Sequence, residues 1–463
     1  MKLKGNGALT SSFRDPSGFL FFQDGTLFRQ VNHSYKDHYD HLLDSGLYQA
    51  LTDAHLMVSH VEANHLLRHG ATAYKILQPE VVPFISYPYE WCFGQLKRAA
   101  LITLKIQKVA LEFDMCLKDA SAYNIQFVKN KPIIIDTLSF EKYRAGRPWV
   151  AYRQFCRHFL APLALMKFRD SRLSQLLRIN LDGIPLDLAS LLLPSYTYLK
   201  FGILSHIHLH ARTQKYYAGK TIAVKDHKMS RKTLLLLIEN LESSIRKMQY
   251  QVESTQWGDY YENTNYTDVA LQSKKQILSD YLEKADIKNV WDLGANDGTF
   301  SRVASDKGIP TIAFDMDHAA VEKNYRECLK RKETHILPLR LDLTSPSASS
   351  GWGNQERMSL RERGPADAIL ALALIHHLAI SNNLPLTRIA EFFADLCNWL
   401  VIEFVPKSDS QVQRLLSTRE DIFPNYTRQA FEDDFSQYFA MQACSQIEDA
   451  DRTLYLFRNK ISH

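Results

Sequence analysis

A glycine-containing turn after a buried strand carries the residues best suited to hold a small ligand. The apolar strand Val290–Leu293 runs directly into the sequence Gly-Ala-Asn-Asp-Gly at 294–298. Two glycines at this spacing let the backbone turn sharply and let a ligand lie against the main chain. Asp292 and Asp297 make the turn acidic, which disfavours a pyrophosphate and favours a cationic sulfonium ligand that carries an ammonium group. One strand later, Asp315 stands where a carboxylate can accept hydrogen bonds from both hydroxyls of a ribose.

Two adjacent histidines, His376 and His377, follow another buried apolar segment. In open α/β sheets, ligands and catalytic groups collect at the carboxyl ends of the strands. An imidazole with a pKa of about 6.5 can accept a proton from a hydroxyl or an amine during group transfer. The alternative is that one histidine packs against the helix that follows while the other only lines the pocket.

The next strand ends in three charged residues, Glu403, Lys407 and Asp409, near the same rim of the expected sheet. They are candidate substrate contacts. The alternative is that they are solvated, as charged residues in loops usually are.

Helices alternate with short apolar strands from residue 269 onward, and these elements must position the residues above. Such alternation predicts a doubly wound α/β fold with a mostly parallel sheet covered on both faces. The expected strands are 289–293, 311–314, 336–341, one from 367, and 400–404, and the expected helices are 270–284, 300–307, 319–332 and 387–399.

Residues 266–463 resemble the class I S-adenosylmethionine-dependent methyltransferases. The segments 292–298, 314–322, 339–343 and 366–378 match four of the family's motifs in order. The resemblance implies a Rossmann-like domain that binds S-adenosylmethionine. The residues it implies as cofactor ligands are Asp292, Gly294 and Gly298 around the methionine part, Asn296 in the same turn, Asp315 at the ribose and Asp342 at the adenine. Of the aromatic residues just ahead of the domain, Trp257, Tyr260, Tyr261 and Tyr266, we favour Tyr266 as a lid over the cofactor, and packing of the connector is the alternative.

The sequence lacks three motifs, and their absence restricts the class of methyl acceptor that we expect. Neither Asn-Pro-Pro-Tyr nor Asp-Pro-Pro-Tyr follows the fourth strand, and no Pro-Cys stands there, which disfavours methylation of nucleobase amines and of cytosine C5. The expected function is methylation of an oxygen or nitrogen of a small-molecule or carbohydrate-like acceptor, with His376 or His377 accepting the proton. RNA modification and a non-catalytic cofactor-binding scaffold are the alternatives.

The first half of the chain predicts a mixed α+β domain. Around residues 96–140, a helix is followed by Asp119, Asn124, a hairpin and Asp136, an order that resembles the carboxyl-lobe core of kinase-like folds. The resemblance implies that Asp119 positions a hydroxyl and that Asn124 and Asp136 hold Mg²⁺. Lys75 is the candidate phosphate-pairing lysine, although no glycine-rich phosphate loop is evident.

Positive charge is concentrated in one segment. Residues 142–250 carry 19 Lys and Arg against six Asp and Glu, whereas the whole chain has a net charge of only +5. This segment could attract an anionic acceptor, including RNA, or face the acidic second half of the same protein. The predicted organisation is an N-terminal acceptor or partner domain (1–250), an aromatic connector (251–268) and a methyltransferase domain (269–463).

Other features suggest a protein of the reducing cytoplasm. The six cysteines form no Cys-x-x-Cys pair, and no apolar run is long enough for a membrane span. His206, His208 and His210 would lie on one face of a strand, but alternation on a half-buried element explains this spacing as well as a metal site does. No metal cofactor is expected.

Overall fold

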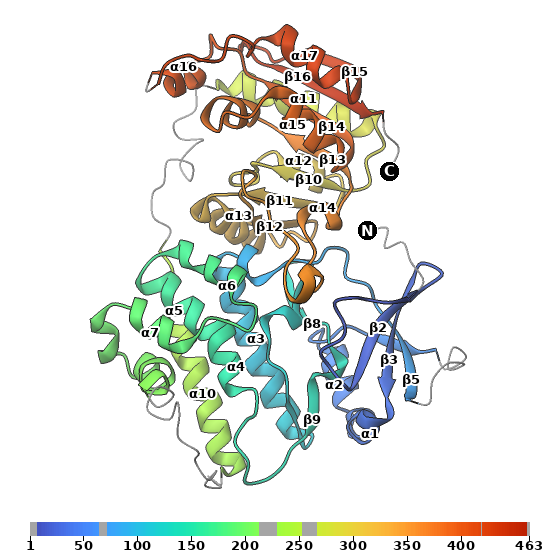
Figure 1. Ribbon diagram of the computed structural model, residues 1–463, viewed down its shortest axis with the longest axis vertical. Coiled ribbons are helices and arrows are strands. Elements are labelled where there is room, and N and C mark those ends of the chain that lie inside the picture. The colour runs from blue at the N-terminus through green and yellow to red at the C-terminus, as the bar shows by residue number, and fades with distance from the viewer. Residues whose placement is uncertain (1–6, 64–71, 213–228, 252–265, 418, 461–463) are drawn as a thin grey trace. The chain divides into compact units, whose positions relative to one another are not determined.

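The computed structural model describes residues 7–63, 72–212, 229–251, 266–417 and 419–460, which form two compact units (Figure 1). The N-terminal unit comprises residues 2–251 and 350–357, and the C-terminal unit comprises residues 252–349 and 358–463. The segment 350–357 thus belongs to the N-terminal unit although both of its flanks belong to the other one. Most of the predicted connector 251–268 lies outside the described residues.

The C-terminal unit is built on a seven-stranded sheet in the order β12-β11-β10-β13-β14-β16-β15. The five strands β10 to β14 pair with one another in parallel, and β16 runs antiparallel to both β14 and β15. The order reverses at β10, which pairs with both β11 and β13, and ligands bind at such a switch point. The predicted α/β class with a mostly parallel sheet is confirmed. The strands are β10 (Val290–Leu293), β11 (Thr311–Asp315), β12 (Ile336–Arg340), β13 (Ala366–Ala371), β14 (Cys397–Phe404), β15 (Phe439–Gln446) and β16 (Thr453–Asn459).

The four predicted helices of this unit occur in the predicted order, with the largest boundary shift at the last of them, and α14, α16 and α17 were not predicted. The expected helix 387–399 ends at Ala394, and the strand expected from 400 begins at Cys397. Cys397 and Trp399 pair with β13, so residues 397–399, which we expected at the end of the helix, belong to the strand. An apolar pattern this short does not distinguish a helix from a strand. The helices are α11 (Asp268–Lys284), α12 (Ser301–Ser305), α13 (His318–Arg331), α14 (Leu360–Arg363), α15 (Leu386–Ala394), α16 (Ser410–Leu416) and α17 (Arg428–Ser436).

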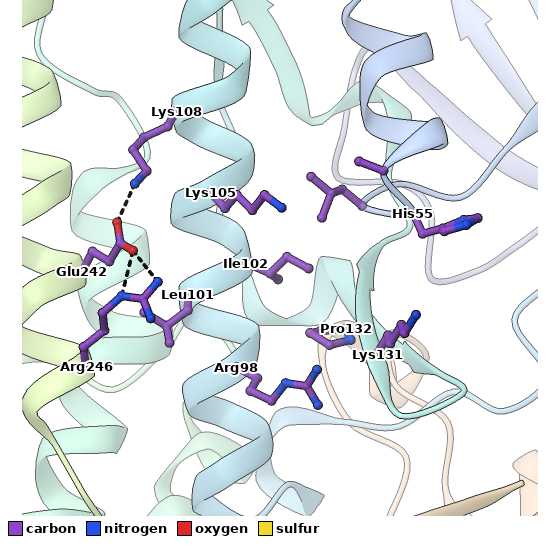
Figure 2. Close-up of a pocket in the computed structure, with 12 residues that line it drawn as sticks. His55, Arg98, Leu101, Ile102, Lys105, Lys108, Lys131, Pro132, Glu242 and Arg246 are labelled. Atoms are coloured by element: carbon purple, nitrogen blue, oxygen red, sulfur yellow. Dashed lines mark hydrogen bonds and ion pairs between the residues drawn. The ribbon is translucent and has the colours of Figure 1, made fainter. Parts of the chain in front are cut away.

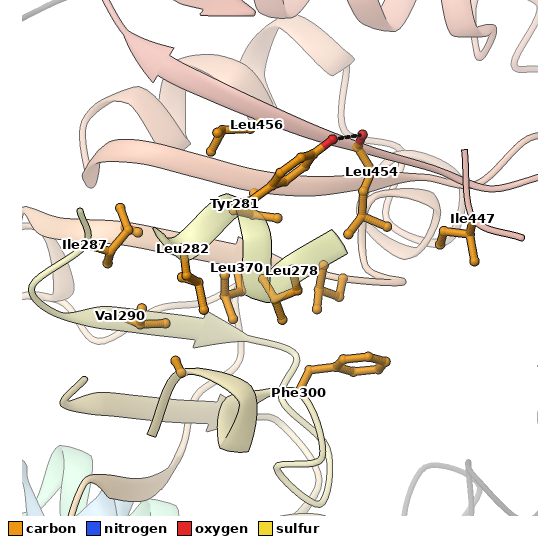
Figure 3. Packing of buried hydrophobic residues seen from close by; sticks show 14 of the residues in the cluster. Leu278, Tyr281, Leu282, Ile287, Val290, Phe300, Leu370, Ile447, Leu454 and Leu456 are labelled. Carbon is orange, nitrogen blue, oxygen red and sulfur yellow. Dashed lines mark hydrogen bonds between the residues drawn. The ribbon is translucent and has the colours of Figure 1, made fainter. Parts of the chain in front are cut away.

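Helix α11 covers one face of the sheet through a mostly apolar contact (Figure 3). Leu278 and Leu282 lie against Val290 of β10 and Leu370 of β13, and all four are buried. Tyr281 of the same helix donates a hydrogen bond to the carbonyl of Leu454 on β16, at 3.3 Å. The helix therefore anchors the centre of the sheet beside the carboxyl ends of its strands.

We predict that Leu278→Ala lowers the free energy of unfolding by about 3 kcal/mol, because it leaves a cavity in this contact. Urea unfolding of the full chain is the measurement. Val269→Ala, on the same helix at a side chain that is 46% exposed, serves as the control and should change stability by less than about 0.5 kcal/mol. Equal losses for the two variants would contradict this account of the core.

The N-terminal unit begins with a five-stranded antiparallel sheet in the order β1-β2-β3-β5-β4. The β2–β3 hairpin turns at Asp24 and Gly25, which both have positive φ, as a two-residue hairpin of this kind requires. Its strands are β1 (Gly7–Ala8), β2 (Gly18–Gln23), β3 (Thr26–Asn32), β4 (His60–Glu62) and β5 (Ala73–Pro79), with helices α1 (Lys36–Asp44) and α2 (Leu47–Asp53) between β3 and β4.

The rest of this unit is mostly helical around the long helix α3 (Phe93–Glu112). Two small strand pairs follow it, β6 (Met115–Leu117) with β9 (Phe140–Lys142) and β7 (Ile125–Val128) with β8 (Lys131–Ile134). The later helices are α4 (Tyr152–Phe155), α5 (Ala161–Phe168), α6 (Leu176–Ile179), α7 (Leu186–Leu192), α8 (Phe201–Ile203) and α10 (Arg231–Lys247).

The segment with three histidines is helical, so its prediction as a strand is wrong. His206 and His208 lie in a π-helical turn, Leu204–His208. Both rings bond to neighbouring side chains, with His206 at 2.7 Å from Tyr152 and His208 at 2.7 Å from Ser190. Among the described residues, no group of three His, Cys, Asp or Glu is arranged to hold a metal ion, and no helix is both long and apolar enough to cross a bilayer.

Candidate functional site

A cavity of about 310 Å³ opens at the carboxyl ends of β10, β11, β12 and β13. Six of the seven residues predicted as cofactor ligands line it, namely Tyr266, Asp292, Gly294, Asn296, Asp315 and Asp342. The seventh, Gly298, lies in the same turn but is not among the lining residues. The fold therefore brings residues that are spread over the sequence from Tyr266 to Asp342 to one pocket.

The turn after β10 depends on residues that tolerate positive φ. Gly294 and Gly298 both have φ of 82°, and Asn296 between them has φ of 52°. A Cβ on Gly298 would lie 2.5 Å from the side-chain amide of Asn324 on α13. Gly298 thus lets the turn pack on a neighbouring helix, whereas Gly294 presents bare main chain to the cavity.

Two buried carboxylates form the polar wall of the cavity. Asp315 accepts backbone hydrogen bonds from Asn296 and Asp317, each at 2.8 Å, one at each carboxylate oxygen. Asp292 accepts a hydrogen bond from the Ser301 hydroxyl at 2.6 Å. Burial raises the pKa of Asp315 to about 6 and that of Asp292 to about 7, so a bound cation would favour their ionised forms.

A buried network of charges supports the same wall. Lys274 and Glu403 form an ion pair at 2.6 Å, with side chains that are 1% and 0% exposed. Glu403 also accepts hydrogen bonds from the Tyr266 hydroxyl and from the backbone N–H of Ala373, the latter at 2.6 Å. Burial would raise the pKa of Glu403, but the positive charges of Lys274 and Arg452 lower it below its usual value.

Arg452 extends this network to a second carboxylate. It donates to the Tyr266 hydroxyl at 2.7 Å and to Asp409 at 2.8 and 3.1 Å. Glu403 and Asp409, both predicted as substrate contacts, are therefore engaged in buried bonds and are not among the residues that line the cavity. Lys407, the third such residue, pairs with Asp421 at 2.7 Å.

The two histidines occupy different positions. His377 lines the cavity, whereas His376 is fully buried behind it, and their ring centroids are 4.1 Å apart. Neither ring nitrogen of His376 has a hydrogen-bond partner among the described residues. Burial lowers the pKa of His377 to about 4 and that of His376 well below its usual value, so both rings are neutral near neutral pH.

Lys274 and Arg452 are the functional residues that the sequence analysis missed. Lys274 had a detectable signal, because it falls on the apolar stripe of α11 four residues from both Ala270 and Leu278. A lysine at such a position needs a buried partner. Arg452 had no detectable signal in the sequence, because it stands in an ordinary polar turn before β16.

The N-terminal unit has its own polar cavity, of about 680 Å³, and Asp119, Asn124 and Asp136 all line it. Lys75 does not line this cavity and instead pairs with Glu62 at 2.6 Å. Arg29 of β3 is the cation that faces Asp136, at 2.7 Å. The carboxylate of Asp119 accepts bonds from the Ser121 N–H and the Gln154 amide, both at 2.8 Å, and burial raises its pKa.

A second groove of the same unit, of about 540 Å³, lies between α3, α10 and the β7–β8 hairpin (Figure 2). Its apolar floor includes Leu101 and Ile102, and its one lining carboxylate, Glu242, pairs with Lys108 and Arg246. Cations thus gather here although residues 1–141 are balanced in charge overall. The cationic lining residues are Arg98, Lys105, Lys108, Lys131 and Arg246.

Two features define the C-terminal unit as a class I methyltransferase-type fold. One is the strand order, in which the antiparallel strand β16 is inserted between β14 and β15, and the other is the acidic glycine turn at the switch point. The resemblance found in the sequence is thus confirmed. No model of a known protein family matches the sequence. The nodulation protein NoeA of Rhizobium meliloti (strain 1021) is 34% identical over 464 residues, covering 97% of this chain and 96% of its own length. The chain belongs to the family of this protein.

Solved structures align with less than half of the chain. They include the PH0226 protein from Pyrococcus horikoshii OT3 (15% identity, TM-score 0.32, 44% of this chain and 99% of that one). Another is the magnesium protoporphyrin IX methyltransferase ChlM from Synechocystis PCC 6803 with bound SAH (14% identity, TM-score 0.29, 42% of this chain and 84% of that one). A third is the bifunctional kinase-methyltransferase WbdD (18% identity, TM-score 0.28, 42% of this chain and 40% of that one).

We predict a pH dependence of stability that comes from Asp292. Its raised pKa means that the folded protein holds a proton which the unfolded chain releases above about pH 4. This contribution to stability is complete below about pH 4 and is lost as the pH rises through about 7. Asp292→Asn keeps an acceptor for Ser301 and removes the titration, so the variant should lose less stability between about pH 5 and 8.

Urea unfolding at several pH values measures this difference. Asp286→Asn, at a side chain that is 84% exposed, is the control and should keep the wild-type pH dependence. If Asp292→Asn follows the wild-type profile throughout, the proton is not held at Asp292.

Proposed function

We propose that this protein is an S-adenosylmethionine-dependent methyltransferase that acts on an oxygen or nitrogen of a small-molecule or carbohydrate-like acceptor. The observation that carries the proposal is the single cavity at the switch point of the sheet, lined by six of the residues that the methyltransferase motifs imply. S-adenosylmethionine would supply an electrophilic methyl group on its sulfonium.

The lining residues fit this cofactor by their chemistry. Backbone bonds at both oxygens orient the Asp315 carboxylate, and its remaining lone pairs suit two ribose hydroxyls. Asp342 accepts from the N–H and hydroxyl of Thr344, at 2.9 and 2.6 Å, and suits the adenine amino group. Asp292 supplies negative charge near the bare main chain of Gly294, which suits the cationic methionine part.

His377 is the better candidate for proton acceptance, because it faces the cavity and its ring is neutral near neutral pH. His376 would then act by packing behind it. Glu403 and Asp409 would act on the acceptor only indirectly, because Glu403 positions Tyr266 and Asp409 positions Arg452. Lys407 remains a predicted substrate contact.

The RNA-modifying alternative draws on positive charge for a phosphate backbone. The cation-rich groove of the N-terminal unit supports an anionic partner, yet among the described residues of the segment 142–250 only Arg246 belongs to its positive lining. A cofactor-binding scaffold without turnover is the other alternative, and only an activity measurement separates it from an enzyme.

A phosphotransferase-like role of the N-terminal unit is a second candidate function. The observation in its favour is that Asp119, Asn124 and Asp136 line one cavity, as a base and two Mg²⁺ ligands would need to. The pairing of Asp136 with Arg29 would have to open for Asp136 to bind a metal ion. The kinase-like fold of this unit is part of the same proposal.

We predict that the full chain binds S-adenosylmethionine and that Asp315→Ala weakens this binding at least about tenfold, because a charged acceptor of two hydrogen bonds is lost. Isothermal titration calorimetry is the measurement. Asp306→Ala, at an exposed acid of the same unit, is the control and should bind as the wild type does. Absence of binding to the wild type, or unchanged binding to Asp315→Ala, would contradict the assignment of the pocket.

We predict methyl transfer to a small molecule or carbohydrate when the protein is incubated with methyl-labelled cofactor and fractionated cell extract. His377→Ala should lower kcat by about 10²-fold or more while cofactor binding is retained, because it removes the proton acceptor. His376→Ala is the matched comparison and should have the smaller effect. Label in RNA would support the RNA alternative, no label would support the scaffold, and full turnover by His377→Ala would exclude its role as the base.

A further inference from the structure

The polar cavity of the N-terminal unit is lined by three arginines that form no ion pair with a carboxylate among the described residues. Six cationic side chains and five carboxylates line it. Three of the cations form ion pairs, Arg14 with Glu356, Arg29 with Asp136 and Lys118 with Asp15. The other three, Arg153, Arg157 and Arg357, form no ion pair within the described part of the chain.

Two of these guanidinium groups have a buried Nε–H without a hydrogen-bond partner among the described residues. Arg157 donates from Nη2 to the carbonyl of Gly183 at 3.1 Å, while its buried Nε has no partner among the described residues. Arg357 stacks on Tyr123, with the guanidinium carbon 4.1 Å from the ring centroid, and its Nε is likewise buried without a described partner. Such donors are rarely left unsatisfied inside a protein unless a ligand or water completes them.

A buried histidine stands beside the two arginines. His158 is 2% exposed, its Nδ1 has no hydrogen-bond partner among the described residues, and its ring packs edge-on to Tyr123. Burial and the positive charges of Arg157 and Arg357 lower the pKa of His158 to about 3. Arg157 and Arg357 form no ion pair in the described part of the chain, although Asp182 also lines the cavity and acts on Arg157. Two arginines in this state beside a neutral buried ring form an arrangement that an anion stabilises.

The segment 350–357 holds Arg357 in this position. Glu356 accepts two hydrogen bonds from Arg14, at 2.8 and 2.6 Å, and one from the backbone N–H of Trp352 at 2.7 Å. Gly351 closes the turn with φ of 87°, and a Cβ there would lie 2.5 Å from the Glu356 side chain. The position of Arg357 is therefore fixed by specific contacts within the N-terminal unit.

We propose that this cavity binds a tetrahedral oxyanion group, a phosphate or sulfate carried by a small molecule, through Arg153, Arg157 and Arg357. Forked guanidinium donors match the oxygens of such groups, and charge-assisted hydrogen bonds are the strong ones. His158 contributes a neutral polar edge at the same place. The site does not depend on methyl transfer, and it requires residues of the segment 350–357 as well as of the helical region after Asp119.

Titration of the full chain with inorganic phosphate, and separately with inorganic sulfate, tests the site by calorimetry. We expect binding at one site, weakened about tenfold or more in Arg157→Gln and in Arg357→Gln. Arg153→Gln, at an exposed position where folding is not at stake, should also weaken binding. Arg172→Gln is the matched control outside the cavity, with a side chain that is 77% exposed, and should leave binding unchanged.

The two titrants distinguish a phosphate site from a sulfate site, and acetate serves as an anion without tetrahedral geometry. Circular dichroism checks that each variant is folded. Absence of binding to both oxyanions, wild-type affinity in all three cavity variants, or binding of acetate as tightly as phosphate would overturn the proposal. Binding of ATP that requires Mg²⁺ and is unaffected by Arg157→Gln and Arg357→Gln would also overturn it, in favour of a metal-nucleotide site.

Discussion

The ion pair between Lys274 and Glu403 is the interaction on which the architecture of the C-terminal unit depends. It joins α11 to the end of β14, and Glu403 also binds the backbone at the end of β13 and the hydroxyl of Tyr266. Removing one partner of such a buried pair typically costs about 3–5 kcal/mol, because the other charge is left unpaired. Three separate stretches of chain, 266–274, the end of β13 and the end of β14, are thus held together at the cavity.

This arrangement determines the electrostatics of the pocket. Lys274, which itself lines the cavity, opposes the rise in the pKa of Asp292, and Arg452 helps to lower that of His377. Burial is the larger cause at both groups. Asp292 and Asp315 have raised pKa values, and His377 has a lowered one. A cationic ligand would stabilise the two carboxylates in their charged form, while the neutral imidazole could still accept a proton. The pocket suits a positively charged cofactor for this physical reason.

One stretch of chain contributes to cavities in both units. Asp342 and Thr344, after β12, line the cavity of the C-terminal unit, and Glu356 and Arg357 line the polar cavity of the N-terminal unit. The polar insertion between β12 and β13 is therefore more than a surface loop. It completes a charged site in a unit from which it is separated by about a hundred residues of sequence.

The sequence by itself determined the α/β class, the alternation of the main helices and strands from α11 to β14, and the turn that carries Gly294 and Gly298, because periodicity and backbone preference are local properties. It also indicated Asp292 and Asp315, which lie in the last residues of β10 and β11, and the pair His376 and His377, which follows the apolar segment of β13. Only the tertiary structure decided the pairing of Lys274 with Glu403 and of Arg29, rather than Lys75, with the cavity of the N-terminal unit. These partners are far apart in sequence, and no local pattern specifies which charges meet when strands and helices pack.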